Sequence, residues 1–388
     1  MTTPPVTLVV TTGGNSMERL ARALAAHLPV RTLDSDIFAT SAGRFGLSSS
    51  EALAAARRDL AFARSLRRLR GVVHLPNHHL ARYGTVLKRP YVVTVHDLIR
   101  QLDRRLDEPL IHRPDRRDRL MLELDVRGIR RASALIAVSR HTKESLVRLL
   151  GVPPERITVI PPGVDTSRFR PLGGARSPLP HPYLLFVGSE HPRKNLGGLL
   201  RAFRELKREP RLADLRLVKV GGPGGSEAAF RQGTLRALRE LGLEREVILR
   251  DRVAPEELVR LYSAARCLVL PSLYEGCGLP PLEAMACGCP VIVSDRTALP
   301  ELAGPGALVS DPRPERLAAA IARLLDDPVL ARRLAREGRR HVRHLTWERA
   351  AESTMEVYER LLGAEPRTGP ARPPAPEWRL PVAEPSGS

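Results

Sequence analysis

Two carboxylates in the second half of the chain flank a proline-containing turn and have the spacing to hold a ligand that carries both phosphates and hydroxyls. Glu275 and Glu283 stand on either side of a Gly-Leu-Pro-Pro run at residues 278–281, which we expect to open a helix because proline is favoured in a first helical turn. The free N–H groups at such a helix start, here those of Gly278 and Leu279, attract anions such as phosphate. Ionised carboxylates instead accept hydrogen bonds from hydroxyls. A nucleotide sugar, which has a diphosphate between two hydroxylated rings, meets both demands.

The sequence around these glutamates resembles the E-x7-E signature of the retaining GT-B glycosyltransferases, glycosyltransferase family 4 in particular. Residues 271–292 read Pro-Ser-x-Tyr-Glu-Gly-x-Gly-Leu-Pro-x-Leu-Glu-Ala-Met-Ala-x-Gly-x-Pro-Val-Ile, and a pattern of this length is far more specific than two glutamates alone. The resemblance implies that Glu283 binds the ribose diol and that Glu275 contacts the transferred sugar. A solvated acidic pair beside a surface helix is the other interpretation of the two glutamates.

A basic loop precedes the next candidate helix. The run Gly-Ser-Glu-His-Pro-Arg-Lys-Asn at residues 188–195 follows an apolar strand pattern at 183–187. Arg193 and Lys194 therefore stand at the carboxyl end of a strand, where cations are well placed to hold a diphosphate. The run resembles the G-x-x-x-P-R-K-N element of the family, which assigns both residues to the donor phosphates. Ser189 occupies a position where some relatives carry arginine, so this phosphate contact is either missing or supplied elsewhere. An ordinary basic helix start is the alternative.

Three further positions are candidates for the same ligand. Gly13 and Gly14 follow the first strand pattern, and a backbone without side chains lets a ligand approach closely. His96 ends the apolar run at residues 91–95. The resemblance places the two glycines against the donor phosphate and His96 near the donor sugar, although a hydrogen-bonded histidine at a strand end is an alternative. It also implies that main-chain groups around Val253 contact the base, which leaves the nucleotide undecided.

No metal or cofactor site is predicted. His74, His78 and His79 form a group of imidazoles, but Pro76 interrupts any helix between them, so we favour a loop or an acceptor pocket over zinc. The four cysteines lie between residues 267 and 289 without a C-x-x-C pair, which is typical of reduced packing residues. The resemblance likewise implies chemistry that requires no metal, with the nucleotide sugar bound as a substrate.

The chain carries a net charge of +19. Nearly all of the positive charge is arginine, which partly reflects a GC-rich coding bias, and as a functional feature this excess points to an anionic partner. Nucleic-acid binding usually combines basic patches with stacking aromatics, whereas aromatic residues make up only 4% of this chain. The charge therefore favours peripheral contact with an anionic membrane and no nucleic acid. No apolar run is long enough to span a bilayer and no secretory signal is recognisable, so we expect a cytoplasmic protein that contacts the inner face of the cell membrane.

Apolar runs alternate with helical patterns along the chain, which predicts parallel sheets covered on both faces. The 388 residues exceed one ordinary core. We expect an N-terminal Rossmann-like acceptor domain at 1–172, a linker at 173–181, a Rossmann-like nucleotide-sugar domain at 182–345 and a Pro-rich disordered tail at 364–388. The resemblance implies the α/β GT-B fold, with two doubly wound domains facing across a cleft and a C-terminal helix at 346–363 that crosses back to the first domain.

The activity that the resemblance implies is transfer of a hexose, of the mannose or glucose type, from a nucleotide sugar to an acceptor hydroxyl with retention. The acceptor would be a carbohydrate or a lipid-linked molecule in cell-envelope polysaccharide or glycolipid synthesis. Two alternatives stay open. One is a GT-B enzyme of other chemistry, such as an epimerase or phosphorylase, and the other is a non-catalytic, basic membrane-binding protein.

Overall fold

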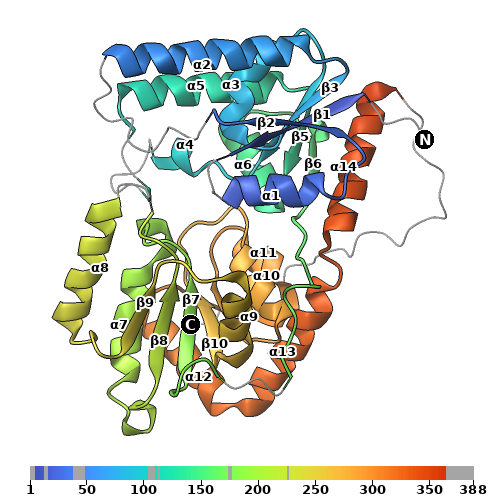
Figure 1. Ribbon diagram of the computed structural model, residues 1–388. Coiled ribbons are helices and arrows are strands. Elements are labelled where there is room, and N and C mark those ends of the chain that lie inside the picture. The colour runs from blue at the N-terminus through green and yellow to red at the C-terminus, as the bar shows by residue number, and fades with distance from the viewer. Residues whose placement is uncertain are drawn as a thin grey trace. The chain divides into compact units, whose positions relative to one another are not determined.

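The computed structural model describes residues 5–12, 16–37, 49–103, 110–111, 114–173, 177–224 and 227–363. The chain forms two compact units, the first containing the elements from β1 to β6 together with the C-terminal helix α14, and the second those from β7 to α13 (Figure 1). Among the described residues, no helix has the length and apolar character needed to cross a membrane.

The first unit is a parallel six-stranded sheet with the order β2-β1-β3-β4-β5-β6. Its strands are β1 (Val6–Thr11), β2 (Arg31–Ser35), β3 (Val72–Leu75), β4 (Tyr91–Val95), β5 (Ala134–Ala137) and β6 (Ile157–Val159). Its helices are α1 (Ser16–Ala25), α2 (Ser49–Arg68), η1 (His78–Leu80), α3 (Ala81–Gly84), α4 (Ile99–Asp103), α5 (Arg116–Arg131), α6 (Arg140–Leu150), η2 (Pro154–Arg156) and α14 (Trp347–Leu362). Successive side chains of a strand point to opposite faces, so Leu8 and Val10 join one core cluster while Val9 joins the other. Burial on both faces explains why the inner strands are mostly apolar rather than alternating, whereas the edge strand β2 is polar and largely exposed.

The C-terminal helix is part of the first unit. Helix α14 packs across β3 and β5 beside α1 (Figure 1), and Val357 and Tyr358 are buried in the core cluster there. The Tyr358 hydroxyl lies 2.6 Å from Nδ1 of His74, whose Nε2 lies 2.8 Å from Oγ1 of Thr94. Burial lowers the pKa of His74 to about 3, so this imidazole is a neutral packing group that ties α14 to β3 and β4.

The second unit is also a parallel six-stranded sheet, with the order β12-β11-β10-β7-β8-β9. Its strands are β7 (Tyr183–Val187), β8 (Arg216–Val220), β9 (Val247–Arg250), β10 (Cys267–Leu270), β11 (Val291–Ser294) and β12 (Ala307–Ser310). Its helices are η3 (Pro192–Lys194), α7 (Leu196–Leu206), η4 (Pro210–Leu212), α8 (Glu227–Leu241), α9 (Pro255–Ala264), α10 (Leu279–Ala286), α11 (Leu299–Ala303), η5 (Gly304–Gly306), α12 (Pro314–Asp326) and α13 (Pro328–Val342). The chain runs outward from β7 through β8 to β9, then returns to β10 on the other side of β7. The sheet therefore changes direction between β7 and β10, and in open sheets of this kind ligands bind outside the carboxyl ends of the strands at such a point.

The boundary between the units lies earlier than expected. Apart from the described residues 110–111, which also belong to it, the second unit begins at Val164 rather than after residue 172. Val164 and Phe169 pack into its core, and the Val164 N–H donates to the Leu345 carbonyl at 2.8 Å. Residues 174–176 of the expected linker and the whole expected tail, 364–388, lie outside the described residues.

Candidate functional site

The candidate site of the second unit is built where its strand order reverses. Strand β7 pairs with β10 in parallel, so the loops that follow these strands leave from the same edge of the sheet. The first loop carries Arg193 and Lys194 on the short helix η3, and the second carries Glu275. Strand pairing thus brings together residues that are 82 positions apart in the sequence.

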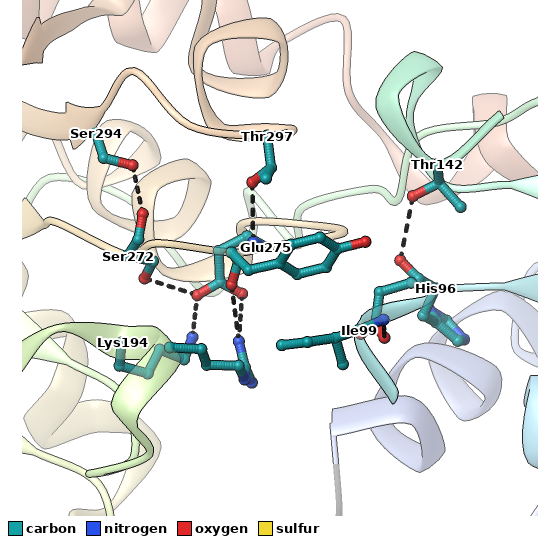
Figure 2. A network of polar contacts seen from close by, with 11 residues as sticks. His96, Ile99, Thr142, Lys194, Ser272, Glu275, Ser294 and Thr297 are labelled. Carbon is teal, nitrogen blue, oxygen red and sulfur yellow. Dashed lines mark hydrogen bonds and ion pairs between the residues drawn. The ribbon is translucent and has the colours of Figure 1, made fainter. Parts of the chain in front are cut away.

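Glu275 is the centre of this site (Figure 2). Its Oε2 accepts a hydrogen bond from Nη1 of Arg193 at 2.9 Å, and its Oε1 forms an ion pair with Nζ of Lys194. Oε1 also accepts from the Ser272 hydroxyl at 2.8 Å. Burial by itself would raise the pKa of Glu275, but the charges of Lys194 and Arg193 outweigh it and the pKa is lowered. The carboxylate is therefore held ionised between two cations and in a fixed orientation.

Two residues that hydrogen-bond to the loop carrying Glu275 have an unusual backbone conformation. Among the described residues, Asn195 and Thr297 are the non-glycine residues with positive φ, both at 55°. A β-branched residue rarely adopts this left-handed conformation, and such strain concentrates at functional sites. Oγ1 of Thr297 accepts the Glu275 N–H at 2.9 Å (Figure 2). Nδ2 of Asn195 donates to the Pro271 carbonyl at 3.3 Å, so both strained residues fix the loop that carries the carboxylate.

Glu283 lies on α10, and like Glu275 it is only 5% exposed. Its Oε2 accepts from the Tyr262 hydroxyl at 3.1 Å. The interpretation of the two glutamates as a solvated surface pair is therefore wrong, because the fold removes both from water. Helix α10 begins as expected at Leu279 after Gly278, with prolines in its first turn and no side chain capping it. The uncapped N–H groups at this end are suited to an anion.

Sequence analysis missed a second buried ion pair next to the site. Nζ of Lys219 on β8 donates to Oε1 of Glu190 at 2.7 Å, and both side chains have 0% exposure. Nε of Arg231 donates to the same carboxylate oxygen at 2.9 Å, and this guanidinium also pairs with Asp251 at the end of β9. The network joins the loop after β7, which contains Ser189, to the segment that leads to Val253. A lysine in the middle of an apolar strand was the sequence signal that pointed to a buried partner.

The first unit contributes a second group of candidate residues around His96. Nε2 of His96 lies 2.8 Å from the Pro76 carbonyl, so this nitrogen carries the proton and donates. Nδ1 is then an acceptor, and it is buried without a hydrogen-bond partner in the described part of the chain. Burial also lowers the pKa of His96. The ring is therefore a neutral imidazole with one unused acceptor, rather than the fully hydrogen-bonded strand-end histidine that was the alternative.

Of the other first-unit residues considered from the sequence, His78 and His79 are described by the structure and Gly13 and Gly14 are not. The rings of His78 and His79 have centroids 4.2 Å apart and are tilted by 46° to each other. The described residues contain no group of three or more His, Cys, Asp or Glu side chains that could hold a metal ion. Gly13 and Gly14 lie outside the described residues.

Two family models match this chain in succession. The model described as "Glycosyltransferase Family 4" covers residues 13–168, and the model described as "Glycosyl transferases group 1" covers residues 175–341. The chain belongs to the family 4 glycosyltransferases. The second match spans the elements that carry Arg193, Lys194, Glu275 and Glu283, so the motifs that suggested the family lie inside the region that defines it.

Three curated relatives of this family 4 chain come from actinobacteria. A D-inositol 3-phosphate glycosyltransferase of Acidothermus cellulolyticus is 37% identical over 72% of this chain and 63% of the relative. A second one, from Kineococcus radiotolerans, is 36% identical over 61% of this chain and 60% of the relative. An MMP alpha-(1->4)-mannosyltransferase of Mycolicibacterium hassiacum is 34% identical over 70% of this chain and 66% of the relative. The matches thus span somewhat less than two thirds of each of these relatives.

Solved structures confirm the fold class of this family 4 chain. A sucrose-phosphate synthase from Thermosynechococcus elongatus superposes with a TM-score of 0.75 at 25% identity, over 93% of this chain and 99% of that one. The Anabaena protein HepE, in a complex with UDP and glucose, superposes with a TM-score of 0.72 at 17% identity, over 91% and 99%. The expected α/β GT-B class, with two Rossmann-like sheets, is therefore confirmed.

Proposed function

We propose that this protein transfers a hexose from a nucleoside diphosphate sugar to an acceptor hydroxyl. The observation that carries the proposal is the buried Glu275 carboxylate, held between Arg193 and Lys194 at the point where the second sheet reverses its strand order. The names of the curated relatives, which are mannosyl- and other glycosyltransferases, support it. The UDP-glucose complex of HepE supports a nucleotide sugar as the ligand class.

The charges of the site suit a leaving diphosphate. Arg193 and Lys194 together exceed the charge of Glu275 by one positive unit, and the start of α10 adds the partial positive charge of a helix N-terminus. Both cations have N–H groups beyond those used on Glu275, since a guanidinium has five donors and an ammonium three. As the glycosidic bond breaks, negative charge grows on the diphosphate, and preorganised cations stabilise that charge without reorganisation. We assign this role to Arg193 and Lys194, with no metal in the step.

The two glutamates then act as hydroxyl acceptors. Glu283 would bind the ribose diol, and Glu275 would position the transferred sugar. We assign the unused Nδ1 acceptor of His96 to a hydroxyl of that sugar. Gly278, Leu279, Ser189 and the main chain at Val253 complete the binding of the nucleotide.

We also propose that the transferred sugar keeps its anomeric configuration. A phosphate oxygen of the leaving group can take the proton of the acceptor on the same face of the sugar. This step requires no protein base, and it gives retention.

The proposed pathway and location rest on family analogy alone. We propose cell-envelope polysaccharide or glycolipid synthesis at an anionic membrane, with a carbohydrate or lipid-linked acceptor.

Calorimetric titration with UDP-glucose and with GDP-mannose, without metal, tests the proposal. We expect one of them to bind wild-type protein and to bind the Glu283→Gln variant more weakly. The Glu256→Gln variant is the matched control, because Glu256 is an exposed residue in the first turn of α9. If neither nucleotide sugar binds the folded protein, the proposal is wrong. NMR of the product with and without acceptor then distinguishes retaining transfer from epimerisation or phosphorolysis.

A further inference from the structure

Helix α13 carries an arginine face that the proposed transfer reaction does not use. It consists of six exposed arginines, five on the helix and Arg343 as its C-cap with helical φ and ψ: Arg332, Arg333, Arg336, Arg339, Arg340 and Arg343. At the 100° that an α-helix turns per residue, all six fall within an arc of about 120°. Leu330, Leu334 and Val342 are buried and lie outside this arc, so the helix packs on the second unit with one side and presents the arginines on the other.

Within the described residues, no ion pair neutralises the charge of the arginine face. None of the six guanidinium groups forms an ion pair in the part of the chain that the structure describes, whereas Arg211, Arg231 and Arg250 each pair with a carboxylate there. Glu337 is the only acidic residue of α13, and it lies about 40° beyond the edge of the arc. Asp327 at the start of the helix is occupied as its N-cap, where it accepts the N–H groups of Val329 and Leu330.

Two neighbouring residues extend this face. Val329 is 68% exposed, and its position in the helix falls within the same arc, so an apolar side chain stands at the N-terminal end of the arginines. At the other end, a Cβ on Gly288 would lie 3.6 Å both from Cδ of Arg339 and from Cγ of Pro171. The Pro171 ring therefore lies close to Arg339, and the residue before it, Arg170, is also exposed.

We propose that the arginine face of α13 binds the anionic surface of a lipid bilayer. From Arg332 to Arg343 the face is about 16 Å long, which suits a parallel approach to a surface that carries many negative charges. Binding would be mainly electrostatic, because the apolar side of α13 is buried in the second unit and Val329 is the apolar residue exposed beside the arginines. Helix α13 contains no aromatic residue, and stacking aromatics are what single-stranded nucleic acid would require.

The expected affinity follows from the number of arginines. Each basic side chain near an anionic bilayer strengthens binding about fivefold, so replacing three of them should weaken binding about a hundredfold. Charges further from the bilayer than the Debye length of about 8 Å contribute little at physiological salt. The position of the arginines, rather than the net charge of the protein, should therefore decide binding.

Vesicle sedimentation with the full chain tests this proposal, with vesicles of phosphatidylcholine alone and of equal parts phosphatidylcholine and phosphatidylglycerol. The test variant is the triple Arg332→Gln, Arg336→Gln, Arg339→Gln. The control is the triple Arg201→Gln, Arg204→Gln, Arg236→Gln, which removes the same charge from exposed positions on α7 and α8. All six positions are exposed, so both triples should keep the wild-type melting temperature.

We expect wild type and the control triple to bind only the anionic vesicles, in a salt-dependent manner, and the α13 triple to lose about a hundredfold in the partition coefficient. The proposal is overturned if wild type does not bind anionic vesicles, if both triples lose binding equally, or if the α13 triple loses binding to duplex DNA while vesicle binding is unchanged. Sedimentation is measured without nucleotide sugar, and nucleotide-sugar binding without vesicles. Either proposal can therefore fail without the other.

Discussion

Replacement of Lys219 by methionine tests whether the buried ion pair behind the loop after β7 has the role that its geometry implies. Lys219 and Glu190 both have side-chain exposures of 0%. Burial lowers the pKa of Lys219, and the bond to Glu190 opposes that effect. The ammonium group donates to Oε1 of Glu190 at 2.7 Å and to the carbonyls of Gly221 and Gly222. Methionine has a similar length and no donor, so it removes these bonds with little change of shape.

The expected loss in the free energy of unfolding is about 3 kcal/mol. Removing one partner of a buried pair costs about 3–5 kcal/mol, because the other charge stays buried without compensation. Here Arg231 still donates to Glu190 at 2.9 Å, which places the expected loss at the lower end of that range. Adding Glu190→Gln to Lys219→Met removes the uncompensated charge, so the double variant should regain about 2 kcal/mol relative to Lys219→Met alone.

Guanidinium unfolding of wild type, the two single variants and the double variant gives these differences as a thermodynamic cycle. Hydrogen exchange of the β8 amides reports on the second unit separately from the first. The matched control is Lys207→Met, since Lys207 is less buried and donates only to backbone carbonyls. A loss of less than about 1 kcal/mol in Lys219→Met, or a double variant less stable than both single ones, would refute the reasoning, because both results require that Glu190 is not a buried charge.

Three further predictions follow from the site and the core. Glu283→Gln should raise the KM for the nucleotide sugar about tenfold with little change in kcat, because a ribose contact is equally strong in the ground and transition states; steady-state kinetics measure the split. Arg193→Gln with Lys194→Met should lower kcat/KM about a thousandfold, or ~4 kcal/mol, because these cations face the leaving diphosphate. Near-normal turnover in that double variant contradicts the leaving-group assignment. Because burial lowers the pKa of His74 to about 3, the unfolded chain binds a proton that the folded chain does not as the pH falls below 6.5, and stability is lost by about 1.4 kcal/mol per pH unit. Unfolding of His74→Gln at a series of pH values should give a slope smaller by that amount, and an unchanged slope argues against a neutral buried His74.

The prediction for the double variant Arg193→Gln, Lys194→Met needs a control for protein stability. Removing Arg193 and Lys194 leaves Glu275 buried without a cation, so the variant can lose activity through lost stability. A triple variant that also carries Glu275→Gln removes that charge. If the double variant melts below wild type, recovery of the melting temperature in the triple variant without recovery of turnover separates the role in catalysis from the role in folding.

The sequence by itself determined the class of the fold and the candidate residues of the site. Alternation of apolar runs with helical patterns predicts parallel sheets, since a strand buried on both faces is mostly apolar. The helix start within the Gly-Leu-Pro-Pro run at residues 278–281 was predictable, because prolines in a first turn are a local signal of a helix N-terminus. Glu275, Glu283, Arg193 and Lys194 were identified because their neighbours form motifs in which each residue type has a physical role.

Only the tertiary structure decided which of these residues meet. Nothing local to Lys194 or Glu275 specifies that β7 pairs with β10, because strand order depends on which apolar faces are buried together and on where the chain reverses across the sheet. The same holds for His74 and Tyr358, which are 284 positions apart and whose contact ties the last helix to the first unit. It also holds for the left-handed conformation of Thr297, which no propensity of threonine favours and which the surrounding packing imposes. Lys219 shows most clearly what the sequence cannot predict. The sequence places a charge in an apolar strand, but its partner Glu190, which makes the burial possible, comes from the loop after another strand.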